Sequence, residues 1–123
     1  MTITEAISRI DILKPNSFSQ DEKIRWLSSL DLHIKLDIMD AHEGADDVQF
    51  SGYADGTDPS TELLVPAPYD DIYLYWLEAS IDYWNGEMSR YNNSITMYNT
   101  ALTAFERHYH STHMPKGKKL KFF

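Results

Sequence analysis

Apolar side chains recur at steps of three and four in the first part of the chain, and this spacing predicts two amphipathic helices. A Thr-x-x-Glu capping box begins at Thr2, and a Ser-x-x-Glu box begins at Ser19. The apolar stripes that follow the two boxes are Ile3, Ala6, Ile7, Ile10 and Leu13, then Ile24, Leu27, Leu30, Ile34 and Ile38. Pro15 ends the first predicted helix, and Gly44 is placed to end the second.

Residues 45–68 break this periodicity, because glycine, proline, aspartate and serine dominate them. A long ordered loop fits this composition. A small β-hairpin, with extended pieces at 48–53 and 62–65, fits it equally well. A loop of this length is uncommon in a compact domain and is often functional.

From Tyr69 onward, apolar and aromatic residues follow a heptad seam with an unbroken phase. Its members are Leu74, Leu77, Ile81, Trp84, Met88, Tyr91, Ile95, Tyr98, Leu102, Phe105 and Tyr109. The phase favours one long helix from Asp70 to about His110, roughly 60 Å in length. Asn85–Gly86 and residues 91–94 are the weak points, where the helix would kink or fold into a hairpin.

The seam is rich in aromatic residues, which are enriched at protein interfaces. A continuous seam of this length exceeds what two helices of about 15 and 30 Å can cover. We therefore expect part of it to contact another subunit. The candidates for this contact are Leu74, Trp76, Leu77, Trp84, Tyr91 and Tyr98.

The composition is typical of one folded domain: 123 residues, 42% of them hydrophobic, with a net charge of −8 and no cysteine. The start of the chain predicts no signal peptide, and no run of 18 apolar residues predicts a membrane span. The charge is unevenly placed. Residues 1–113 carry 7 lysines and arginines against 19 acids, whereas residues 114–123 carry four lysines and no acid. Such an acidic body argues against general nucleic-acid binding, which needs cations to contact phosphates.

The candidate metal-binding chemistry is weak. His108, His110 and His113 cluster near the end of the seam and could bind zinc or nickel, but histidine is also favoured at a helix C-terminus. Acids of the 45–68 segment lack the EF-hand spacing that calcium would need. The chain contains no nucleophile elbow, phosphate loop or dinucleotide fingerprint. The sequence therefore predicts no enzyme activity and no cofactor.

Four stretches of the chain resemble head–tail connector (adaptor) proteins of long-tailed bacteriophages and Gram-positive prophages. They are "KIRWLSSLD" (23–31), "TELLVPAPYDDIYLYWLEASIDYWNGE" (61–87), "RYNNS" (90–94) and "THMPKGKKLKFF" (112–123). The resemblance implies a small, mainly α protein of the virion neck, made in the bacterial cytoplasm. It also implies a ring of copies, usually dodecameric, that assembles under the portal, extends the DNA exit channel and offers a docking surface to the next neck protein.

The resemblance also implies how the parts of the chain divide the work. Residues 1–113 would form the helical adaptor domain, and residues 114–123 would form an extended tail that grips the portal protein. The tail residues expected to dock are Lys116, Lys118, Lys119, Leu120, Lys121, Phe122 and Phe123. The candidates for lining the channel or docking the downstream protein are the loop acids Asp46, Asp47, Asp55, Asp58 and Glu62. DNA would pass without specific binding, and no membrane would be involved.

Three other interpretations stay open on the sequence alone. The tail could be a frayed, solubilising end, although two terminal phenylalanines argue against it. The chain could be a small helical oligomerising or regulatory protein outside any virion, which uses the seam to dimerise. A metal-dependent hydrolase built on His108, His110 and His113 is the third interpretation, and metal analysis of the purified protein tests it.

Overall fold

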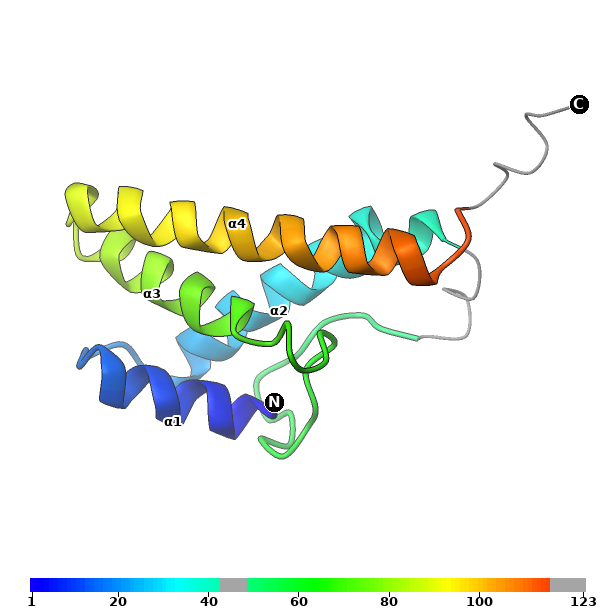
Figure 1. Ribbon diagram of the computed structural model, residues 1–123. Helices are drawn as coiled ribbons and strands as arrows, with labels where there is room; N and C mark the ends of the chain where they lie inside the picture. The colour runs from blue at the N-terminus through cyan, green and yellow to red at the C-terminus, as the bar shows by residue number, and fades with distance from the viewer. Residues whose placement is uncertain (43–48, 116–123) are drawn as a thin grey trace, which may run out of the picture.

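The computed structural model describes residues 1–42 and 49–115 and confirms the mainly α fold. Within these residues the α-helices are α1 (Ile3–Leu13), α2 (Gln20–Asp37), α3 (Ile72–Trp84) and α4 (Met88–Thr112), with a 3-10 helix, η1 (Met39–Ala41), after α2. α4 runs along one edge of the molecule with α3 beside it, and α1 lies at the opposite edge (Figure 1). No β-strand forms within the described residues, so the β-hairpin considered for the 45–68 loop is absent from residues 49–68.

The predicted helix starts are confirmed by their caps. The side chain of Thr2 accepts from the Glu5 backbone N–H, and the Glu5 carboxylate accepts from the Thr2 backbone N–H. These two hydrogen bonds complete the capping box of α1. Ser19 accepts from the Glu22 backbone N–H at the start of α2. The predicted end of the second helix is wrong, because α2 ends at Asp37 and Gly44 lies outside the described residues.

The heptad seam is divided between two helices. The continuous helix favoured by its phase is wrong, and the hairpin that the sequence left open is the one observed. The chain reverses at Gly86, which adopts φ +75°, a conformation that costs little only in glycine. Folding back brings Tyr98 of α4 against Trp76 of α3 and Phe105 against Tyr69, and both α4 side chains are buried within one chain. Burial of this apolar area outweighs the few hydrogen bonds that a continuous helix would add, and Asn-Gly is a poor helix former.

A buried carboxylate, Asp31 of α2, joins the long loop to the helices. It accepts hydrogen bonds from the Tyr73 hydroxyl at 2.7 Å, from the Leu64 backbone N–H at 3.1 Å and from the Tyr53 hydroxyl. The Tyr73 hydroxyl in turn accepts from the Val65 backbone N–H at 2.7 Å. Burial raises the pKa of Asp31 above its ordinary value, although the phenol and backbone donors oppose the shift. Burial and the Asp31 charge raise the pKa of Tyr53 and Tyr73.

A second buried carboxylate, Asp82, joins three helices near the hairpin turn. Its Oδ1 lies 2.6 Å from the Lys14 ammonium, which follows the end of α1. Its Oδ2 accepts a hydrogen bond from the Ser94 hydroxyl of α4 at 2.8 Å. Because a buried charge is stable only when it is paired, Asp82 fixes the positions of α1 and α4 relative to α3.

We predict that Tyr73→Phe destabilises the fold more than Tyr53→Phe. Loss of the Tyr73 hydroxyl leaves the buried Val65 N–H without its acceptor and removes one donor to Asp31, at a cost of about 2–3 kcal/mol. Loss of the Tyr53 hydroxyl removes one donor only and costs about 1 kcal/mol. Urea denaturation followed by circular dichroism measures both values, and equal losses would contradict the role given to Val65.

The raised pKa of Asp31 predicts a specific pH dependence of stability. The folded chain binds the proton of the Asp31 carboxyl more tightly than the unfolded chain does. The contribution of this carboxyl to the free energy of unfolding is therefore fully present below the ordinary pKa of 3.8, and it is lost as pH rises through the folded-state pKa. The free energy of unfolding of the wild type, minus that of Asp31→Asn, should therefore fall between pH 4 and pH 7. A difference that stays constant or rises over this range would show that burial does not dominate the site.

Candidate interaction surface

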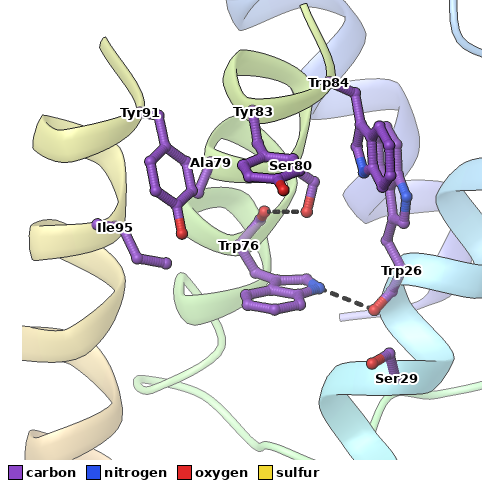
Figure 2. A pocket seen from close by; sticks show the side chains of 9 residues that line it. All are labelled: Trp26, Ser29, Trp76, Ala79, Ser80, Tyr83, Trp84, Tyr91 and Ile95. Carbon is purple, nitrogen blue, oxygen red and sulfur yellow. Dashed lines mark hydrogen bonds between the residues drawn. The ribbon is translucent and has the colours of Figure 1, made fainter. Parts of the chain in front are cut away.

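An uncharged, largely aromatic groove is bounded by α2, α3 and α4, and we call it the aromatic groove (Figure 2). Its volume is ≈ 230 Å³. Its lining residues are Trp26, Ser29, Trp76, Ala79, Ser80, Tyr83, Trp84, Tyr91 and Ile95. None of them is charged, although 30 of the 123 residues of the chain are Lys, Arg, Asp or Glu.

The polar atoms at the floor of the groove are satisfied within the chain. Trp76 Nε1–H donates to the Trp26 carbonyl oxygen at 2.8 Å and so joins α3 to α2. The Ser80 hydroxyl donates to the Trp76 carbonyl oxygen at 2.8 Å (Figure 2). The Trp76 ring also packs on Tyr98, with ring centroids 4.9 Å apart. Trp76 therefore offers ring carbon to a partner, and neither Trp76 nor Ser80 keeps a donor that binding would leave unpaired.

The groove opens toward the hairpin turn through a cluster of exposed aromatic rings. Tyr83 makes edge contacts with Trp84 and Tyr91, at centroid distances of 5.1 and 5.4 Å. Trp84 is 61% exposed and Tyr83 is 48% exposed. Large apolar side chains that gather on a surface mark a site of protein contact. The groove can bind a partner by burying apolar side chains, because aromatic and aliphatic residues dominate its lining and none of the lining residues is charged.

The six residues predicted from the seam to contact another subunit divide into two groups. Leu74, Leu77 and Tyr98 are buried inside the chain, and burial raises the pKa of Tyr98 to about 12. The argument that the seam is too long to be covered within one chain fails for these three residues, because the chain itself covers them. Trp76 and Tyr91 are half-buried and line the aromatic groove together with the exposed Trp84.

The three histidines of the metal hypothesis lie near the end of α4 and contact other side chains. His108 stacks on Tyr69 and His113 stacks on Tyr109, with ring centroids 4.7 and 3.8 Å apart. His110 Nδ1 lies 2.6 Å from Nε2 of the buried His42. Within residues 1–42 and 49–115, no group of three His, Cys, Asp or Glu side chains is placed to hold a metal ion.

His42 is a structural residue that sequence reasoning missed. Its Nδ1 lies 2.7 Å from the Ile38 carbonyl oxygen, which can only accept, so Nδ1 carries the proton. A neutral His42 then accepts from His110 through Nε2. The backbone of His42 also forms an isolated antiparallel bridge with Pro115. A single histidine in an irregular segment gives no periodic signal that could have revealed these contacts.

The loop acids are dispersed over the surface. Asp55 lies 3.5 Å from Arg25, and Glu62 lies 3.2 Å from the Met1 amino group. Asp58 accepts from the backbone N–H and the hydroxyl of Ser60, which lowers its pKa. Asp46 and Asp47 lie outside the described residues, as do the predicted docking residues Lys116, Lys118, Lys119, Leu120, Lys121, Phe122 and Phe123.

Comparisons with known proteins identify no relative: no family model, curated protein or solved structure matches this chain. In the part of the chain that the structure describes, no helix combines the length and apolar character needed to cross a membrane.

We predict that Trp84 supplies most of the tryptophan fluorescence that acrylamide can quench, because Trp84 is 61% exposed while Trp26 is 8% exposed. Trp84→Phe should lower the quenching constant of the protein by about half or more, whereas Trp26→Phe should leave it near the wild-type value or raise it. Stern–Volmer titration measures both variants. An unchanged quenching constant for Trp84→Phe would mean that this ring is covered in solution.

Proposed function

We propose that this chain is a structural head–tail connector of a long-tailed phage or prophage. Copies would assemble as a ring on the portal, extend the DNA exit channel and connect the capsid to the tail. The proposal assigns no enzyme activity to the chain and places the protein in the virion neck. Its first support is the resemblance of four stretches, which together include all of α3 and part of the first turns of α4.

The observation that carries the proposal is the contrast between a folded acidic body and a basic, aromatic terminal sequence. The body of residues 1–113 has 7 basic against 19 acidic residues, and residues 116–123 read KGKKLKFF. Four lysines suit an acidic protein surface, and a leucine with two phenylalanines suits apolar pockets. A short segment of this kind can dock on a larger partner by adding contacts at several adjacent pockets.

The attachment point of this terminal segment supports a docking role. α4 ends at Thr112, and the backbone bridge between Pro115 and His42 holds the following residues against the body. The terminal lysines and phenylalanines therefore begin from a fixed point at one end of the fold.

The acidic body also suits a channel that DNA must traverse without adhering. Negative side chains repel phosphates over about one Debye length, which is about 8 Å at physiological salt. Asp55, Asp58 and Glu62 are exposed on the long loop and are the described candidates for lining the channel or docking the downstream neck protein.

We predict that a chain truncated after Pro115 folds normally but no longer attaches to portal-bearing particles. Its helical circular dichroism should match the wild type, because every helix described in residues 1–42 and 49–115 is retained, as is the Pro115 bridge. Cosedimentation with portal particles measures attachment. A full-length chain with Phe122 and Phe123 changed to alanine separates apolar docking from charge, and its affinity should fall at least about tenfold.

Unchanged attachment of the truncated chain would overturn the docking role of the terminal segment. A full-length protein that ignores portals and instead forms a stable free dimer would favour the rival function, a helical oligomerising protein outside the virion.

A further inference from the structure

The outer side of α4 carries a second uncharged surface, distinct from the aromatic groove. The chain has no charged residue between Arg90 and Glu106, and the exposed residues in this stretch are asparagine, threonine, methionine and alanine. We call the part formed by Thr96, Met97, Thr100, Thr103 and Ala104 the α4 ridge. Met97, at its centre, is 49% exposed and has a flexible side chain that adapts to an apolar pocket.

The ridge is polar in composition but can leave water at small cost. The hydroxyls of Thr96, Thr100 and Thr103 donate to backbone carbonyls four residues earlier in α4, at 2.7, 3.1 and 2.9 Å. The threonines thus satisfy their donors within the helix and expose methyl groups. A surface of this kind strands no hydroxyl donor when a partner covers it.

The ridge and the groove lie on different sides of α4. Tyr91 and Ile95 line the aromatic groove, whereas Met97 and Ala104 line a separate hollow of ≈ 260 Å³ against Tyr69 of the loop. Asp71 is the one charged residue that lines this hollow. A contact between two unlike surfaces on different sides of a subunit is heterologous, so each copy can bind one neighbour on each side.

Charge points to a second copy of the same chain as the occupant of the groove. Two copies each carry a strongly acidic body and repel one another wherever their acids face. The groove contains no charged residue, and the hollows that the ridge residues line include one charge of each sign, Asp71 and Arg107, so two copies can meet there without net repulsion. A single arginine beside the ridge is far fewer cations than a nucleic acid needs.

We propose that neighbouring copies meet head to tail, with the α4 ridge of one copy seated in the aromatic groove of the next. Met97 enters the groove between Trp84 and Tyr91 and buries its side chain against their rings. The proposed contact identifies the two surfaces that would join the subunits of the connector ring. Only the closure of the ring rests on the proposed function.

Cysteine cross-linking tests the contact, because the chain has no native cysteine. Ser29 lies in the groove and Thr100 on the ridge, and both are exposed. With a short bismaleimide, Ser29→Cys/Thr100→Cys should give a ladder of dimers, trimers and larger products. Each single variant alone should stay monomeric, and a mixture of the two single variants should stop at dimers.

The matched control replaces the groove cysteine with one on α1, at the opposite edge of the molecule. Ser8 is exposed, like Ser29, but it lies on α1, away from the proposed contact. Ser8→Cys/Thr100→Cys should therefore give no ladder. In the cross-linking variant, Met97→Glu should lower the yield about tenfold, since it would bury an unpaired charge, whereas Met97→Leu should retain it. Cross-linking is run on concentrated free protein and on protein attached to portal particles.

Dimers from either single variant would overturn the head-to-tail contact in favour of a two-fold one. A yield no higher than the Ser8 control, in both free and attached protein, would also overturn it. The outcomes separate this contact from the proposed function. A ladder without attachment to portals refutes the connector role and leaves the contact standing, whereas attachment without a ladder does the reverse.

Discussion

The fold depends on the buried carboxylate of Asp31, which joins the loop and α3 to α2 through the hydrogen bonds that it accepts. Asp31 is fully buried, and its partners come from the loop and from α3, so one side chain of α2 positions segments more than thirty residues away. A loop of this length would otherwise cost much conformational entropy and leave backbone groups unpaired. Because the loop is fixed there, α3 begins at a defined place, and α4 and the aromatic groove follow from it.

Local patterns predicted the parts of the fold that local interactions create. The capping boxes at Thr2 and Ser19 marked the starts of α1 and α2 because a cap involves residues only three apart. The hairpin was harder to predict, because Trp84 and Met88 keep the four-residue step across the turn at Gly86. A seam that packs on itself and a seam that packs on a neighbour then have the same periodicity.

Long-range contacts account for what the sequence did not predict. The pairing of Asp31 with Tyr73, and of His42 with His110, joins residues 42 and 68 positions apart. No spacing rule relates such positions. The seam did name three residues of the aromatic groove, Trp76, Trp84 and Tyr91, because aromatic side chains gather where surfaces meet. The α2 wall of the groove, formed by Trp26 and Ser29, came only from the packing of α2 on α3.

The bridge between His42 and Pro115 has a mechanical consequence. Tension on the chain beyond Pro115 first meets this bridge, which joins the end of α4 to the segment after α2. His42 is buried and bonded to both Ile38 and His110, so the load spreads over two helices at once. A pull on the chain beyond Pro115 would therefore reach the end of α4 and the segment after α2 together.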